Sequence, residues 1–457
     1  MGEARGGIHR SYAGRIGRLI REPSRSRGAF VVLLLVATLI VWFPSLFIGV
    51  DTSNPDDSYH ITQAALHHEM SDVVGWFACG YWTYDHYEYR PLTRLSMLIT
   101  WFLCGRWPLG YHLGNVLLHF ACALLLGAIL VRAGADIWAA RLAASAWVVF
   151  PAGYRAVSWI SGRGDLLCSA LILLGLWFFL GWLKGKPWPS LAAASASVFL
   201  AALAKEPASV TPLFMVATAF LIPNRRHWTR RLGAAALVGI PLIAYLWIRL
   251  TVYPVAVNLE HYQAMSQPFW LSLRHVTRLL WLARPYELVA FWRPMGIYVV
   301  LLPYFGKLLV EQIAFWAALV LLLRRQLRLT LLGVAWKLIF VLPVLYLYWN
   351  HEWTHHRYLP SMGTAWLVGL AGRELAVWFC ARLRDDRYAV LRWGVVSVAV
   401  LLLLAHYVAQ LPPRWPNWSL VSAGGAAPPA SFGRWPEKSY PQTPPPPPSA
   451  GESRRDH

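Results

Sequence analysis

Apolar runs of about 17–25 residues recur along the chain, separated by short breaks rich in arginine and lysine. Runs of this length match the hydrocarbon thickness that a helix crosses in a bilayer. In lipid such a run must be helical, because each backbone N–H and C=O needs a partner within the segment. Only 14% of the 457 residues are charged, against about 25% in soluble domains. The sequence therefore predicts an all-α polytopic membrane protein.

Alternating these runs across the bilayer gives about 11 transmembrane helices. The first, from about 29 to 50, is too long for a signal-peptide core and has no small-residue cleavage site, so we expect it to be uncleaved. The other spans are expected near 110–131, 138–154, 165–183, 189–204, 208–223, 232–250, 308–323, 330–348, 359–379 and 389–409. The basic breaks then all fall on one side, as the positive-inside rule requires. We expect a multi-pass protein of the inner (plasma) membrane with a cytoplasmic N-terminus and an extracytoplasmic C-terminus.

Three regions follow from this count. Residues 1–27 form a basic cytoplasmic segment, and 28–410 form the membrane domain, with outer loops at about 51–108 and 251–307 that hold extracytoplasmic loop helices. Residues 411–457 are rich in proline, and we expect this tail to be disordered and extracytoplasmic. The net charge of +20 is placed in the breaks between spans, so it indicates topology and a lipid bilayer as partner, with no nucleic acid. Among five scattered cysteines, Cys79 and Cys104 are a candidate pair in an oxidising compartment.

Two carboxylates, Asp56 and Asp57, follow the first span. Adjacent carboxylates at a membrane surface suit a general base, because like charge and partial burial raise one pKa. The alternative is that Asp57 or Ser58 caps an interfacial helix from Tyr59 to about Met70.

Polar residues on the second span form a further group, preceded by Arg90 in the segment YRPLT. His112, Asn115 and His119 are spaced three and four apart, so they share one helix face. They line a wet cavity or form interhelical hydrogen bonds, and the sequence leaves both alternatives open.

Charged pairs mark the outer ends of later spans. Arg163 opposes the positive-inside bias, and the forked N–H donors of its guanidinium suit a phosphate. The alternative for Asp165 is a helix N-cap. Lys205 and Glu206 are expected to pair at the membrane edge as a functional site, unless the lysine extends to the interface.

The segment 351–360 contains His351-Glu352-x-x-His355, which matches the zinc-protease signature H-E-x-x-H. A third zinc ligand is needed, and the next candidate is Glu374, on the cytoplasmic side. The same segment carries His356, Arg357 and Tyr358.

All of these groups fall on the outer side of the predicted topology. Charged groups cost about 2.5–3.5 kcal/mol each at mid-membrane, so their gathering at one face indicates one shared wet cavity. Its mixture of carboxylates, cations and histidines suits an anionic phosphate leaving group and a hydroxyl nucleophile.

The segments DD, YRPLT, GYHLGNVLLH, SGRGDLL, LAKE and RYLPS occur in this order over about residues 30–370. In this order they resemble the membrane half of the tetratricopeptide-containing transmembrane O-mannosyltransferases and their bacterial relatives. These belong to the GT-C superfamily of polyprenyl-phosphate-sugar-dependent glycosyltransferases. The chain departs from them where a proline-rich tail replaces the repeats, which leaves the acceptor class open.

The resemblance implies a GT-C-like bundle that moves a hexose from a polyprenyl-phosphate carrier to an extracytoplasmic protein or glycan hydroxyl, with inversion. It implies an acidic base in the first outer loop, Asp56 or Asp57, and from their charge we expect Arg163, Lys205 and Arg357 at the donor phosphate. The remaining candidates for the cavity are Arg90, His112, Asn115, His119, Asp165, Glu206, His355, His356 and Tyr358. No cofactor is required by this scheme, although Asp56 and Asp57 with His60 or His355 offer ligands for a divalent ion. The alternatives are a zinc intramembrane protease and a non-catalytic transporter of lipid-linked glycans, which predicts mid-span polar residues and inverted repeats.

Overall fold

The computed structural model describes residues 25–47, 55–78, 89–150, 153–223, 226–252, 319, 321–344 and 354–382. The chain divides into two compact units, Met1–Ala409 and Gln410–His457, and all described residues belong to the first. The predicted tail 411–457 therefore lies outside the described residues.

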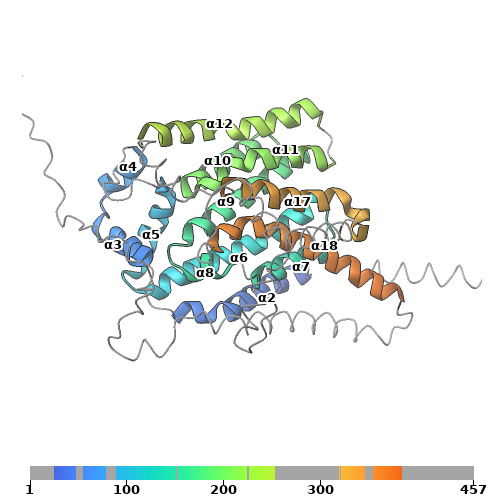
Figure 1. Cartoon of the computed structure of the whole chain (residues 1–457), viewed down its shortest axis with the longest axis horizontal. Helices are drawn as coiled ribbons and strands as arrows, with labels where there is room; N and C mark the ends of the chain where they lie inside the picture. The colour runs from blue at the N-terminus through green and yellow to red at the C-terminus, as the bar shows by residue number, and fades with distance from the viewer. Residues whose placement is uncertain are drawn as a thin grey trace, which may run out of the picture. The chain divides into compact units, whose positions relative to one another are not determined.

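Every secondary-structure element within these ranges is helical (Figure 1). The elements in chain order are α2 (Arg25–Val41), η1 (Phe43–Phe47), α3 (Pro55–Leu66), α4 (Met70–Ala78), α5 (Pro91–Cys104), α6 (Pro108–Ala133), α7 (Ile137–Val148), α8 (Gly153–Ser158), α9 (Arg163–Leu183), α10 (Pro189–Ala204), η2 (Glu206–Val210), α11 (Thr211–Leu221), α12 (Trp228–Val252), η4 (Arg324–Gln326), α17 (Leu327–Val341), η5 (Leu342–Val344), η6 (Thr354–Arg357) and α18 (Tyr358–Arg382).

Three of the described helices are long and apolar enough to cross a membrane: Pro108–Ala133, Arg163–Leu183 and Trp228–Thr251. They coincide with three predicted spans, and shorter apolar helices lie at several of the others. These helices support the prediction of a helical membrane protein. The count of about eleven spans stays a prediction, since the spans expected near 308–323 and 389–409 fall largely or wholly outside the described residues.

Local sequence signals explain where α6 and α7 begin and end. Pro108 lies in the first turn of α6, where a missing backbone N–H costs nothing. Gly134 ends the helix with φ 106°, a left-handed conformation that glycine adopts without strain. Asp136 then caps α7 by accepting a hydrogen bond from the backbone N–H of Trp138 at 2.8 Å.

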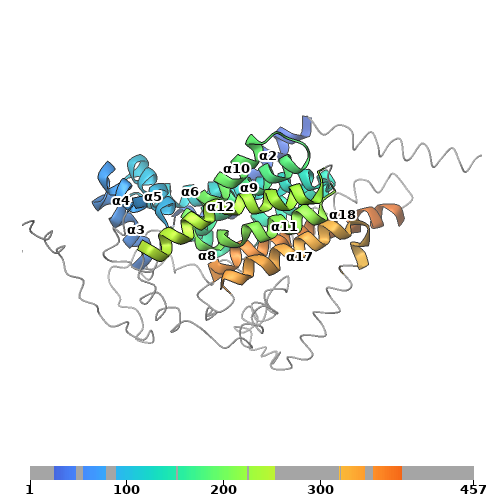
Figure 2. The same ribbon diagram turned by 90° about the horizontal axis from the view of Figure 1, so that it is seen from above.

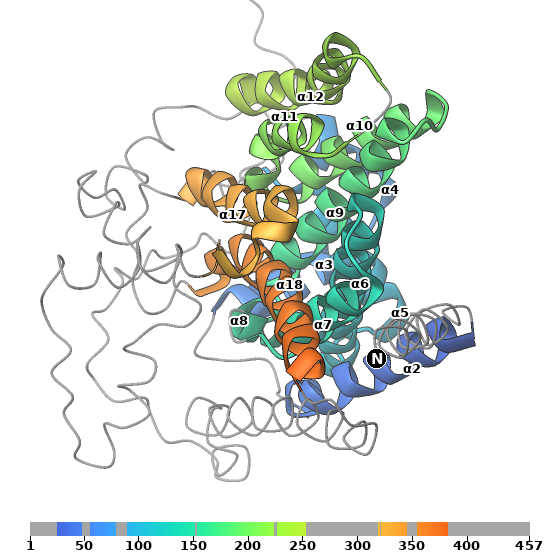
Figure 3. The same ribbon diagram turned by 90° about the vertical axis from the view of Figure 1, so that its right-hand side faces the viewer.

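Helix α9 packs between α6 and α10, and α18 packs against α7 and α17 (Figures 1 and 3). The α7–α18 contact is close, because a Cβ added at Gly369 would overlap the backbone carbonyl oxygen of Ala139. Glycine at this position therefore sets the distance between the two helices.

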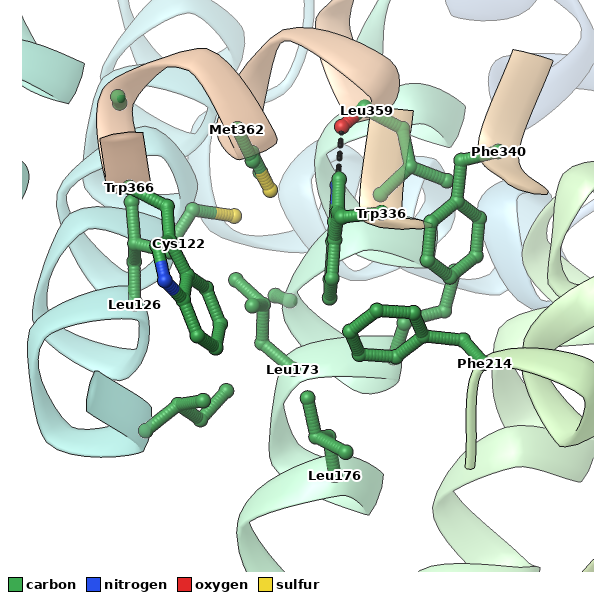
Figure 4. Close-up of a cluster of buried hydrophobic side chains, with 14 of the residues drawn as sticks. Cys122, Leu126, Leu173, Leu176, Phe214, Trp336, Phe340, Leu359, Met362 and Trp366 are labelled. Atoms are coloured by element: carbon green, nitrogen blue, oxygen red, sulfur yellow. Dashed lines mark hydrogen bonds between the residues drawn. The ribbon is translucent and has the colours of Figure 1, made fainter. Parts of the chain in front are cut away.

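A buried aromatic cluster joins α11, α17 and the start of α18, which lie side by side (Figures 2 and 4). The rings of Phe214 and Trp336 meet edge to face at 4.9 Å. The indole N–H of Trp336 donates to the backbone carbonyl of Leu359 at 2.7 Å. This hydrogen bond fixes the first turn of α18, which begins at the candidate site residue Tyr358 and directly follows η6.

Candidate active site at one end of the bundle

The five sequence motifs come from helix ends that the fold brings together. Helix α3 contacts α5, α8 contacts both α9 and η6, and η2 contacts the start of α9. Side-chain hydrogen bonds between these segments link residues up to 239 positions apart in the sequence.

Asp57 ties α3 to the turn that precedes α9. Its Oδ1 accepts a hydrogen bond from the backbone N–H of Ser161 at 2.8 Å, and its Oδ2 accepts one from Ile160 at 3.1 Å. The side chain is buried. Helix α3 begins at Pro55, ahead of both proposed caps, so the prediction that Asp57 or Ser58 caps it is wrong. Asp56 belongs to the first turn of the same helix, but its side chain lies outside the described part of the chain.

Arg163 holds three helices together. Its Nε donates to Asn115 Oδ1 at 2.9 Å, its Nη2 to the Tyr111 carbonyl at 2.6 Å, and its Nη1 to the Ser96 carbonyl and the Thr100 hydroxyl. These bonds use four of the five N–H donors of a guanidinium that is almost fully buried. In this structure Arg163 therefore connects α5, α6 and α9.

Glycine makes this arrangement possible on α6. A Cβ added at Gly114 would lie 2.7 Å from Arg163 Nη2, so a side chain there would displace the guanidinium. The amide of Asn115 also donates to the Trp159 carbonyl at 2.6 Å, which secures the turn before α9.

The predicted polar face of α6 is buried inside the bundle: His112, Asn115 and His119 are all inaccessible to solvent. His119 Nε2 lies 3.3 Å from the Val148 carbonyl, and its Nδ1 lies 2.8 Å from the Tyr358 hydroxyl. Since a carbonyl only accepts, Nε2 carries the proton and Nδ1 accepts from Tyr358. His119 and Asn115 thus form interhelical hydrogen bonds, one of the two alternatives that the sequence left open.

Lys205 pairs with Asp165, with 2.7 Å between Nζ and Oδ2 and both side chains buried. Asp165 lies in the first turn of α9, whose N-cap is Gly162, so the interpretation of Asp165 as the cap is wrong. The predicted pairing of Lys205 with Glu206 is also wrong, because η2 directs the two side chains to different partners.

Glu206 binds two arginines instead. Arg90 donates from Nη2 to Glu206 Oε2 at 2.9 Å and from Nε to both carboxylate oxygens at 3.2 Å. Arg249 Nη1 lies 3.2 Å from Glu206 Oε1. Burial raises the pKa of Glu206, but the charges of Arg90 and Arg249 outweigh it and hold the pKa at about 2, below its ordinary 4.5. This ionic triad joins the start of α5, η2 and the last turns of α12.

His355 and His356 lie together in η6, with 4.1 Å between ring centroids. Burial and the positive charges of Lys205 and Arg90 lower the pKa of each imidazole well below 6.5. Both rings are therefore neutral at physiological pH. Arg357 and Tyr358 follow directly and are buried.

A small pocket opens beside the Lys205–Asp165 pair, with room for about one water molecule. Its polar wall includes Asp165, Ser169, Lys205 and His356, and its apolar wall includes Phe340 and Leu359. The pocket thus lies where α9, η2 and η6 meet.

No three His, Cys, Asp or Glu side chains come close enough to hold a metal ion within the part of the chain that the structure describes. His351, one of the two candidate zinc ligands, and Glu352, the acidic residue of the same signature, lie outside it, as does Cys79 of the candidate disulfide. Glu374, the candidate third zinc ligand, accepts hydrogen bonds from Gln326 and Arg373 farther along α18. The pKa of His60 is lowered to about 3 by burial and by the nearby charges of Arg94, Arg90 and Arg163, surroundings that oppose a second cation.

Two arginines of the site, Arg155 and Arg249, were not predicted from the sequence. Arg155 lowers the pKa of His355, and Arg249 belongs to the ionic triad. The sequence contains a signal that could have identified Arg249. This residue lies at the outer end of a predicted span, so it opposes the positive-inside bias as Arg163 does.

No family model matches this chain. The chain is 27% identical over 186 residues to a Drosophila melanogaster protein named Protein O-mannosyl-transferase Tmtc1. The similar region makes up 37% of this chain and 22% of the fly protein, so the chain matches about a fifth of that protein's length.

Proposed function

We propose that this protein is a membrane glycosyltransferase that moves a hexose from a polyprenyl-phosphate carrier to a hydroxyl on an extracytoplasmic protein or glycan. The observation that carries the proposal is the cation-rich end of the bundle, where Lys205, Arg90 and Arg155 surround two neutral histidines beside a pocket. The partial similarity to a protein named as an O-mannosyltransferase supports the same class of reaction.

Lys205 and His356 are the groups that we assign to the donor phosphate. A lysine ammonium has three donors, and Asp165 takes one, which leaves two for phosphate oxygens. His356 lines the same pocket, and Arg357 adjoins it in the chain. In a site shielded from water, each such preorganised donor stabilises the developing phosphate charge of the transition state by about 3–4 kcal/mol. Arg163 instead becomes a positioning residue, because its guanidinium already binds α5 and α6.

Asp56 is the base in this proposal, and Asp57 fixes the helix that carries it. Hydrogen bonds from two backbone amides stabilise the charged form of Asp57, which weakens it as a proton acceptor. Asp56 is the preceding residue, about 100° away around α3. Asp56 would take the acceptor's hydroxyl proton while the oxygen attacks the anomeric carbon. The bond from that carbon to the phosphate oxygen breaks with its electron pair, so the configuration inverts and no cofactor is needed.

The lipid that co-purifies with the protein tests the donor class. We expect mass spectrometry to find a polyprenyl-phosphate hexose, and the double variant Lys205→Gln/Asp165→Asn to lose most of it. Removing both partners avoids leaving an unpaired buried charge. The control Arg325→Gln/Asp136→Asn also removes one charge of each sign, away from the site, and should keep the lipid. Recovery of ordinary phospholipids alone, even after incubation with the donor, would contradict the proposal.

A further inference from the structure

A second group of cations gathers at the opposite end of α9. We name it the basic cluster: Arg132 at the end of α6, Lys184 and Lys186 after α9, and Arg226 before α12. Helix α9 has 21 residues and rises about 31 Å, which matches the hydrocarbon thickness of a bilayer. Since the candidate active site lies at the first turn of α9, the basic cluster lies at the other membrane interface.

Tryptophan rings and backbone carbonyls hold these cations in place. The Arg132 guanidinium lies 3.8 Å from the ring centroid of Trp177 and donates to the Trp177 carbonyl at 2.7 Å. Lys186 Nζ lies 5.5 Å from the centroid of the same ring. Two positive charges therefore share one indole, an arrangement that repels unless an anion lies between or beside them.

Arg226 extends the group to a second tryptophan. Its guanidinium lies 4.2 Å from the ring centroid of Trp182, and its Nε and Nη2 donate to the carbonyls of Trp182 and Lys186 at 2.8 and 2.9 Å. Gly181 leaves space for the cations, because a Cβ there would lie 3.1 Å from Arg132 Nη1 and 3.3 Å from Lys186 Cδ.

Three of the four cations in the basic cluster have no acidic partner within the ranges that the structure describes. Among the described residues no carboxylate forms an ion pair with Arg132, Lys184 or Lys186. Asp136, close in sequence, is used as the cap of α7. The neighbouring Trp188 is 73% exposed, as expected for a ring at the headgroup level of a bilayer.

We propose that the basic cluster binds the phosphate headgroup of one anionic glycerophospholipid such as phosphatidylglycerol. The positive-inside rule explains why cations are present at this end, but it does not require them to be held in place. Stacking on tryptophan rings and hydrogen bonds to backbone carbonyls orient Arg132 and Arg226 before a ligand binds. Preorganised cations lose little freedom on binding, and a headgroup phosphate at this depth supplies a negative charge to Arg132, Lys184 and Lys186. The site is separate from the proposed donor site, and it stands whether or not the chain is a glycosyltransferase.

Native mass spectrometry of the delipidated full-length protein tests this site, with phosphatidylglycerol, phosphatidylethanolamine and a polyprenyl monophosphate added in turn. Wild type should bind phosphatidylglycerol at least about fivefold more tightly than phosphatidylethanolamine. Arg132→Gln/Lys186→Gln should remove most of that preference. The control Arg325→Gln/Arg328→Gln changes two exposed arginines near the start of α17 and should keep it.

Three outcomes would overturn the proposal: equal binding of the two phospholipids, an equal loss in the control, or a double variant that loses the polyprenyl monophosphate while phosphatidylglycerol stays bound. If the double variant does not fold, the single change Lys186→Gln decides, because Lys186 is exposed and its removal leaves the helix packing intact. It should lower phosphatidylglycerol binding at least about twofold, and unchanged binding would contradict the site.

Discussion

At the scale of single residues, the candidate active site is a set of buried and half-buried charges, several with assigned partners. Asp165 binds Lys205, Glu206 binds Arg90 and Arg249, and Asp57 binds backbone amides. A buried charge that loses its partner costs about 3–5 kcal/mol, so the bonds of the buried Asp57 and Asp165 constrain the helix ends that supply them.

The ionic triad predicts a specific dependence of stability on pH. The pKa of Glu206 is depressed to about 2, so its contribution is complete above its ordinary value of 4.5 and is lost as pH falls from 4.5 toward 2. Melting temperatures measured in detergent between pH 2.5 and 6 (about the range of this titration) should fall at the acid end for wild type. Glu206→Gln should melt lower at pH 6 and show a weaker pH dependence. Parallel curves for the two proteins would contradict the triad.

The sequence predicted several of the charged residues that gather, but it missed Arg155 and Arg249 and did not show which residues pair. Lys205 and Glu206 are neighbours in the chain, yet they bind Asp165 and Arg90, 40 and 116 positions away. Such partners depend on how α9, α10 and α5 pack, and no local pattern encodes this. The positive-inside bias was the more useful signal, because it marked Arg163 as unusual before any packing was known.

At the scale of helices, apolar run length and proline positions largely determined the boundaries. The predicted spans near 165–183 and 189–204 agree closely with α9 and α10. Helix α5 was missed as a separate apolar helix, because its 14 residues are too short for a span and fell within the predicted outer loop 51–108. Close helix contacts were not predictable, because a glycine such as Gly369 shows its partner only in the packed structure.

The α7–α18 contact gives a prediction at this scale. Gly369→Ala places a methyl against the Ala139 carbonyl, so we expect a loss of about 1–3 kcal/mol in unfolding free energy in detergent. Gly233→Ala is the matched control, because no atom lies within 4 Å of its added Cβ and alanine favours helix. Equal stability of Gly369→Ala and wild type would mean that the two helices are farther apart than described here.

At the scale of the whole molecule, the candidate active site and the basic cluster occupy opposite ends of α9. This separation agrees with the predicted topology, in which carboxylates and histidines lie outside and the arginine-rich breaks lie inside. The number of spans and the position of the tail rest on the sequence alone.

A reporter fusion tests that topology. Alkaline phosphatase joined after Ala430 should be active outside the cytoplasm, because eleven spans that start inside must end outside. A cytoplasmic reporter at the same residue should be inactive. The reverse pattern would show that the span count is wrong by an odd number.

The central claim is glycosyl transfer with Asp56 as the base, and turnover in membranes tests it most directly. The measurement is incorporation of labelled hexose from a polyprenyl-phosphate donor into non-lipid product. Asp56→Asn should lower turnover about 10²–10⁴-fold with unchanged melting temperature, the usual worth of general-base catalysis.

Asp57→Asn should instead lower the melting temperature, because an amide NH₂ cannot accept from a backbone N–H and leaves one unpaired. The control Asp136→Asn keeps its helix cap and should leave transfer unchanged. Normal transfer by Asp56→Asn, at wild-type expression, would contradict the mechanism.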